Sequence, residues 1–268
     1  MGLPPMTATG RLREAFAVQI RVIGAILLRD MRTRFGRTHF GYLIAVAWPL
    51  AHLTILTAAN VLMQRVTPMG TNMTIFVGTG LLPYILCLYP SRMTTSAVTE
   101  NRALLLFPIV KSIDLILART VLSLTIAANV TVAFIIIVTL AGVDFWPNSP
   151  VRAIEGVLAT VYLGAAFGML NAVMVTFVPG WTVISIVVMI LMYLTSGAIM
   201  PITRLPQSVQ DVLAYNPMLH CVDWLRSAYY EGYGSDHLDE IYLLQVSTCI
   251  LLVALASERF LRGRIIQG

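Results

Sequence analysis

Three arginines stand close together just before the first long apolar run: Arg29, Arg32 and Arg34, followed by Phe35. A guanidinium group keeps its charge at any physiological pH, and its planar fork of N–H donors matches the oxygens of a phosphate. These residues therefore indicate a site that receives an anionic head group. The alternative is a topology anchor, because positive charge collects on the cytoplasmic side of membrane proteins.

A second polar group occurs late in the chain, where His220, Asp223 and Arg226 follow one another at intervals of three. Such side chains share one face of an α-helix and can bond to each other. A structural ion pair and a catalytic group are both compatible with this spacing. Aromatic rings flank the group and suit either a membrane–water boundary or a surface that stacks on sugars. These rings are Trp224, Tyr229 and Tyr230.

No residue pattern in the chain supplies energy or catalysis. Lys111 is the only lysine, and a nucleotide-binding P-loop would need glycines where Leu105 and Val110 stand. His52 is almost the only ionisable group inside an apolar run, whereas ion-coupled transport relies on such groups. The three cysteines are too scattered for a metal site or a disulfide framework. We therefore expect no cofactor and no metal in this chain, and any work must be powered by a partner.

The composition is that of an integral membrane protein. Hydrophobic residues make up 57% of the 268 positions and charged residues only 12%, against about 25% charged in a soluble protein. Several apolar runs reach the roughly 20 residues that cross a bilayer. We predict one all-α permease domain over 1–268, with spans at 42–63, 73–91, 113–141, 154–178, 181–200 and 241–257.

The charge distribution predicts the orientation. With both termini inside, the cytoplasmic segments hold 14 of the 18 basic residues and 5 of the 13 acidic ones. This asymmetry follows the positive-inside rule and accounts for the net charge of +5 without a nucleic-acid partner.

Three segments outside the spans have distinct patterns. Residues 11–40 carry an apolar stripe at helical spacing, which predicts an amphipathic helix lying in the cytoplasmic interface. Residues 94–111 mix apolar and charged residues before Pro108, which suits either an interfacial loop or a helix that docks on a partner. Residues 201–235 are too polar to span, and Pro206 and Pro217 divide them into two short external helices.

The chain resembles the membrane subunit of type 2 ABC exporters, specifically the permeases of bacterial capsular polysaccharide export. The segment GYLIAVAWPLAH matches the family at Gly41, Tyr42, Leu43, Pro49 and His52. The segment NRALLLFPIVKSIDLILAR matches at Asn101, Leu104, Pro108, Val110, Lys111, Asp114, Ala118 and Arg119. The segment NPMLHCVDWLR matches at Asn216, Pro217, His220 and Arg226, with Asp223 in place of a glutamate.

The resemblance implies a complex in the bacterial inner membrane. Two copies of the chain pair with two cytoplasmic P-loop ATPase subunits, which hold the ATP and magnesium. A tunnel between the copies carries a lipid-linked, acidic polysaccharide toward periplasmic and outer-membrane export components. The external helices re-enter the membrane near the exit.

The resemblance also assigns roles to residues. The residues implied at the substrate entry are Arg29, Arg32, Arg34 and Phe35. The residues implied in the contact with the ATPase are Asn101, Leu104, Leu105, Pro108, Lys111 and Asp114. The residues implied at the substrate exit are His220, Asp223, Trp224, Arg226, Tyr229 and Tyr230. Two departures concern the ATPase contacts: Ser112 replaces a usual proline, and the turn VPGW at 178–181 carries no charge.

Other functions stay open on the sequence alone. An exporter of O-antigen or teichoic acid would show a similar entry region. A channel or ion-coupled carrier would depend on charges within the spans. A membrane enzyme or scaffold acting on lipid-linked sugar would show a need for a divalent metal.

Overall fold

The computed structural model describes residues 8–36, 39–63, 67–178, 180–233 and 237–267. Throughout these ranges every regular element is a helix, which confirms the expected all-helical class. The predicted interfacial segment 11–40 and external segment 201–235 each reach into residues outside the described ranges.

Within the described residues, five helices are long and apolar enough to cross a membrane. One of them is continuous through α3 (Met73–Pro83), the π-helical turn η1 (Tyr84–Leu88) and α4 (Tyr89–Thr95). The other four are α2 (His39–Leu62), α6 (Ser112–Leu140), α7 (Pro150–Met174) and α11 (Glu240–Gln267).

The span expected at 181–200 is shorter in the structure. Helix α8 (Trp181–Leu194) has 14 residues, or about 21 Å at the usual rise, and a bilayer core is about 30 Å thick. The hydroxyl of Thr195 bonds back to the Leu191 carbonyl at 2.7 Å. Gly197 then takes a positive φ of 74°, which turns the chain out of the helix.

Glycine allows the second span to pack closely against its neighbours. A Cβ on Gly80 would lie 2.4 Å from the Ala198 carbonyl oxygen, and one on Gly164 of α7 would lie 2.8 Å from Cys87 Cα. Pro83 removes one helical N–H, and the π-helical turn follows it directly. These glycines therefore serve the packing of this span, which is largely buried.

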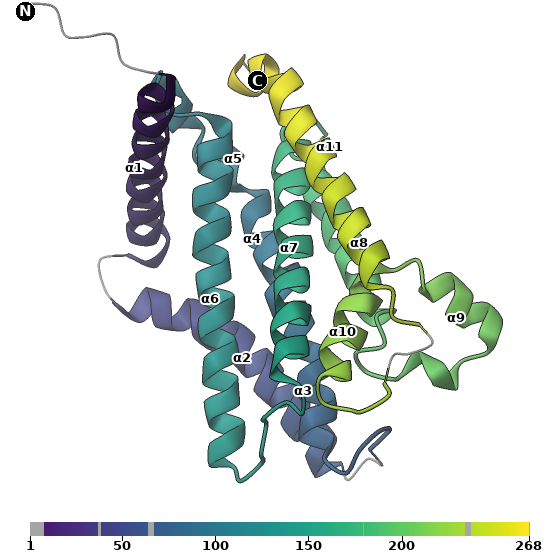
Figure 1. Ribbon diagram of the computed structural model, residues 1–268. Helices are drawn as coiled ribbons and strands as arrows, with labels where there is room; N and C mark the ends of the chain where they lie inside the picture. The colour runs from purple at the N-terminus through teal and green to yellow at the C-terminus, as the bar shows by residue number, and fades with distance from the viewer. Residues whose placement is uncertain (1–7, 37–38, 64–66, 179, 234–236, 268) are drawn as a thin grey trace, which may run out of the picture.

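Figure 1 shows α6, α7 and α11 extending along the length of the molecule, with α1 (Ala8–Phe35) beside the first half of α6. The start of α1 and the end of α11 lie at the same end of the bundle, which we call the terminal end. Helix α5 (Ala97–Glu100) and the 3-10 turn η2 (Arg102–Leu106) also lie there. The opposite, far end carries η3 (Ile202–Arg204), α9 (Gln207–Leu213) and α10 (Pro217–Ser227).

Helix α1 packs on the bundle through only part of its apolar stripe. Ile23 and Leu27 contact a core that includes Leu115 of α6 and Met169 of α7. Ile20 and Phe16, about one and two turns before Ile23, are 53% and 68% exposed. The second half of α1 is therefore fixed against α6, whereas the first half presents apolar side chains outward.

Candidate functional site

A buried ion pair joins α1 to α6 at the terminal end. Arg119 Nε lies 2.7 Å from Asp30 Oδ2, and both side chains are 2% exposed. The two terminal nitrogens of Arg119 also lie 3.1 and 3.2 Å from Glu100 Oε2 at the end of α5. One guanidinium thus connects α1, α5 and α6.

Two of the predicted entry arginines strengthen this connection. Arg29 donates to Asn101 Oδ1 at 2.8 Å. Arg34 forms an ion pair with Glu100 and donates to Ser96 Oγ at 3.2 Å. Burial raises the pKa of the Asp30 carboxyl, and the positive charge of Arg34 opposes that rise. These side chains hold α1 against the segment that follows α4.

The structure does not gather the predicted entry residues into one pocket. Arg29 and Arg34 bond to the 96–101 segment, and Arg32 is exposed. The ring of Phe35 meets that of Tyr42 edge to face, with centroids 5.6 Å apart. Their role in substrate entry stays a prediction.

The predicted ATPase contact divides into buried and exposed residues. Asn101, Leu105 and Asp114 are buried, whereas Pro108 and Lys111 are exposed. Asp114 accepts from the Lys111 backbone N–H at 2.9 Å and from Gln19 of α1 at 2.7 Å. Asp114 therefore begins α6 and binds α1, and it is not available on the surface.

The exposed part of this segment is an apolar tip that begins at the last residue of η2. Its members are Leu106, Phe107 and Ile109, which are 82%, 59% and 59% exposed. The residues predicted for the ATPase contact include Leu104 and Leu105, of which Leu105 is buried, and that role stays a prediction. The signal that separates Leu105 from Leu106 is the tight 3-10 turn, in which adjacent side chains point to different sides.

A cavity of about 510 Å³ lies between this tip and the first half of α1. Its lining includes both apolar and charged residues. From α1 it is lined by Glu14, Ala15, Val18, Gln19 and Val22, and from the other side by Pro108, Ile109, Lys111 and Asp114. The terminal end therefore combines a groove with an exposed apolar projection.

Arg226 is the centre of the far end. Its side chain is fully buried, and it donates to the carbonyls of Gly197 at 2.7 Å and Ala198 at 2.8 Å. The guanidinium carbon stacks 4.1 Å from the centre of the Phe76 ring. Arg226 thus ties α10 to α3 and to the turn after α8.

The other two members of the predicted polar triad bond elsewhere. His220 Nδ1 accepts from the Asp239 N–H at 3.1 Å, so Nε2 donates to the Ala214 carbonyl at 2.8 Å. Asp223 accepts from the Tyr233 hydroxyl at 3.0 Å. Burial raises the pKa of the Asp223 carboxyl, and the charge of Arg226 opposes the rise. This geometry favours the structural interpretation over the catalytic one.

The aromatic side chains predicted at the exit are packed within the protein rather than exposed on its surface. Trp224 is 5% exposed and lies in the same buried core as Ala159 and Leu163 of α7. The Tyr229 hydroxyl donates to the Phe145 carbonyl at 3.3 Å. Tyr230 is partly buried beside Gly70. Sugar stacking by these three rings stays a prediction, and the Trp224 ring offers no free face in this structure.

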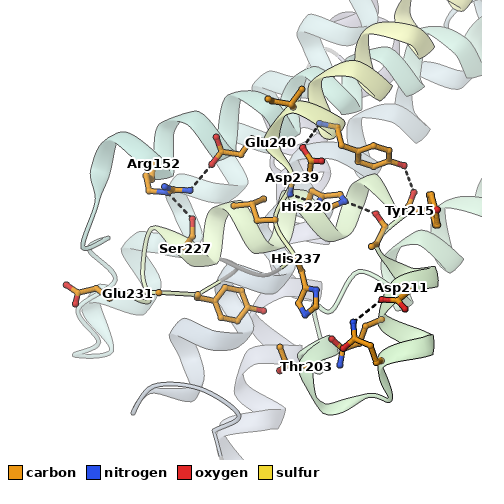
Figure 2. A pocket seen from close by; sticks show the side chains of 18 residues that line it. Arg152, Thr203, Asp211, Tyr215, His220, Ser227, Glu231, His237, Asp239 and Glu240 are labelled. Atoms are coloured by element: carbon orange, nitrogen blue, oxygen red, sulfur yellow. Dashed lines mark hydrogen bonds and ion pairs between the residues drawn. The ribbon is translucent and has the colours of Figure 1, made fainter.

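A large cavity of about 1440 Å³ opens beside α10, between α9 and the start of α11. Figure 2 shows Tyr215 and His220 at its wall, with Asp211, Asp239 and Glu240 around it. Arg152 pairs with Glu240 at 2.7 Å and donates to Ser227 at 3.2 Å. Among the described residues, no group of three or more His, Cys, Asp or Glu is arranged to hold a metal ion.

Comparison of the sequence with known proteins places the chain among transporters. The family model described as "ABC-2 type transporter" matches residues 21–230.

Three curated relatives cover nearly the whole chain. The polysialic acid transport protein KpsM of Escherichia coli is 29% identical over 92% of this chain and 96% of its own length. The capsule polysaccharide export inner-membrane protein CtrC of Neisseria meningitidis is 29% identical over 93% and 95%. The capsule polysaccharide export inner-membrane protein BexB of Haemophilus influenzae is 27% identical over 90% and 91%.

Proposed function

Since the chain belongs to the ABC-2 type transporter family, we propose that it is the membrane-spanning subunit of an ATP-driven exporter of capsular polysaccharide in a bacterial inner membrane. The observation that carries this proposal is the similarity, over nine-tenths or more of both chains, to proteins named for capsule polysaccharide export and polysialic acid transport. The subunit itself is not an enzyme.

A separate P-loop ATPase supplies the energy, because this chain has no P-loop of its own. The apolar tip formed by Leu106, Phe107 and Ile109 is the contact that we propose for that subunit. Burial of these exposed leucine and phenylalanine side chains against a partner would stabilise the complex by about 25 cal/mol per Å² of apolar surface. Lys111 is also exposed beside them.

The ionic connection behind the tip gives the ATPase a mechanical route to α1. The short turn η2 connects α5 to the tip, and Glu100 of α5 shares Arg119 with Asp30 of α1. A displacement of the tip therefore pulls on α1 through two short ion pairs. In the proposed mechanism α1 lies at the cytoplasmic entry and moves with each ATPase cycle.

The substrate that fits the entry is a polysaccharide on an anionic lipid head group. Arg32 is exposed on α1 close to Arg29 and Arg34, and guanidinium groups bind phosphate with two hydrogen bonds. Arg29 and Arg34 hold α1 in place, which leaves Arg32 as the first contact for the head group. Both termini are cytoplasmic in this arrangement.

A second copy of the chain completes the proposed pathway. Helices α2 and α8 present many exposed apolar side chains, among them Trp48 at 77% and Val183 at 65%. The exposed polar ring of His52 lies on the same helix as Trp48, and it stacks near Tyr84 with centroids 5.6 Å apart. A path between two copies would combine such rings from both.

Deletion of the gene in the encoding bacterium tests the proposal. The expected result is loss of surface polysaccharide with accumulation of lipid-linked polysaccharide inside the cell, reversed by the wild-type gene. Continued synthesis with normal surface polysaccharide would reject the export function. Cysteine labelling from outside the cell at both termini would reject the proposed orientation.

A further inference from the structure

Glu155 is an unusual residue for its place in the chain. It lies five residues after the start of α7 at Pro150, about 7.5 Å along the helix axis. Its carboxylate is exposed and has no ion-pair or hydrogen-bond partner among the described residues. Its neighbours Ile154 and Leu158 are 60% and 62% exposed, as expected of a surface that meets lipid. An ionisable group on such a surface is costly and in most proteins has a partner.

A groove of about 510 Å³ runs beside Glu155, between α7 and α11. Its apolar part is formed by Leu158 and Ala159 of α7 and Leu244 of α11. Its polar part contains a second carboxylate, that of Glu240 at the start of α11, and the ring of Tyr162. The two carboxylates therefore lie at the outer part of a groove whose remainder is apolar.

Trp224 lines the same groove and brings an unused donor. Its side chain is 5% exposed, and its indole N–H has no acceptor among the described residues. Its Cδ1, the atom next to that nitrogen, lies 3.4 Å from the position that a Cβ on Gly156 would take. The edge of the ring that carries the N–H therefore lies against α7 at Gly156. A buried donor without an acceptor is unfavourable, and an oxygen-bearing ligand that reached it would relieve this cost.

Cationic and anionic groups are both present beside the groove, because Arg152 of the neighbouring large cavity pairs with the groove residue Glu240. Arg152 pairs with Glu240 at 2.7 Å, and these side chains are 43% and 41% exposed. Arg152 uses Nη2 for Glu240 and Nε for Ser227. A ligand that carries a cation and an anion a few ångströms apart would match this order of charges.

We propose that this groove binds a phospholipid whose head group carries a primary ammonium. The ammonium has three donors and bonds to Glu155 and Glu240, and the phosphate lies against Arg152. One acyl chain occupies the apolar surface of Leu158, Ala159 and Leu244, and an ester oxygen approaches the Trp224 N–H. The inference depends on α7 and α11 being membrane spans and not on the transported substrate.

Binding of defined lipids to the purified chain tests the proposal. Native mass spectrometry would count the molecules retained from phosphatidylethanolamine, phosphatidylcholine and phosphatidylglycerol. Phosphatidylcholine is the matched control because it keeps both charges but lacks ammonium N–H donors. We expect phosphatidylethanolamine to be retained about three- to five-fold more than either, the range that a partly exposed ion pair supplies.

Two variants locate the binding site. Glu155→Gln keeps the shape and removes the charge, so the preference for phosphatidylethanolamine should disappear. Leu158→Trp fills the groove and should lower retention of that lipid. Glu231→Gln is the matched control, because Glu231 is an exposed carboxylate at the same end outside the groove, and it should keep the preference.

Three results would overturn the proposal. Equal retention of phosphatidylethanolamine and phosphatidylcholine would show that the groove does not recognise the ammonium N–H groups. An undiminished preference in Glu155→Gln would place the lipid elsewhere. Efficient cross-linking between two chains through Leu158→Cys would make a second copy the occupant. None of these results depends on transport, so a failure of the lipid proposal would leave the proposed export function untouched.

Discussion

Two buried arginines hold the two ends of this molecule in different ways. Arg119 at the terminal end and Arg226 at the far end are 1% and 0% exposed. Arg119 bonds to carboxylates from two other segments, Asp30 of α1 and Glu100 of α5. Arg226 bonds to the backbone carbonyls of Gly197 and Ala198 and stacks on the ring of Phe76.

The difference indicates which end moves. Backbone carbonyls are fixed by the chain itself, so Arg226 has one arrangement and the far end behaves as a rigid frame. Carboxylate side chains can exchange partners, and Glu100 is already shared between Arg34 and Arg119. We therefore expect the terminal end to change its connections while the helices of the bundle stay packed.

The largest effect on stability is expected from Arg226→Gln. The substitution leaves buried carbonyls without a donor and Asp223 without its nearby cation, so unfolding should become easier by about 3–5 kcal/mol. The thermal unfolding of the purified protein in detergent measures this. Arg204→Gln, at an exposed arginine of the same end, is the matched control. Equal unfolding temperatures for the two variants would contradict a structural role for Arg226.

A smaller effect is expected from Asp30→Asn. Arg119 keeps Glu100 when the Asp30 charge is removed, so the loss should be about 2 kcal/mol, as for one hydrogen bond to a charged group. Combining it with Glu100→Gln should reveal coupling, because the two carboxylates share one guanidinium. Strictly additive losses in unfolding free energy would show that the three groups do not act together.

The smallest stability effect is expected when Arg29, Arg32 and Arg34 are all replaced by lysine. Charge is kept and the pairs are partly exposed, so stability should change by less than about 1 kcal/mol. Surface polysaccharide per permease molecule should nevertheless fall, because lysine lacks the bidentate fork. Unchanged export, with accessibility labelling confirming the orientation, would reduce these arginines to a topology anchor.

Sequence patterns revealed most of the fold because hydropathy and proline positions act locally. The apolar runs gave five of the six expected spans as helices of sufficient length, and Pro206 and Pro217 marked the starts of α9 and α10. The shortened α8 was missed because its end depends on the backbone of Gly197, which hydropathy does not register.

The site was less accessible to sequence reasoning because its residues pair over long range. Asp114 was predicted at a surface, but Gln19, 95 positions earlier, covers it. Tryptophan is a residue type typical of the membrane–water boundary, and Trp224 is buried only because α10 packs on α7. The exposed Leu106 and the buried Leu105 are chemically identical and differ only in their position on a 3-10 turn.

The most direct test of the account measures ATP-driven export through the apolar tip. The permease and its ATPase would be reconstituted in vesicles, and ATP hydrolysis and polysaccharide movement recorded together for wild type and for Leu106→Ser with Phe107→Ser. Both side chains are exposed, so folding should be unaffected. The account predicts that the ATPase no longer co-purifies and that export stops. Wild-type export with a fully bound ATPase would contradict it.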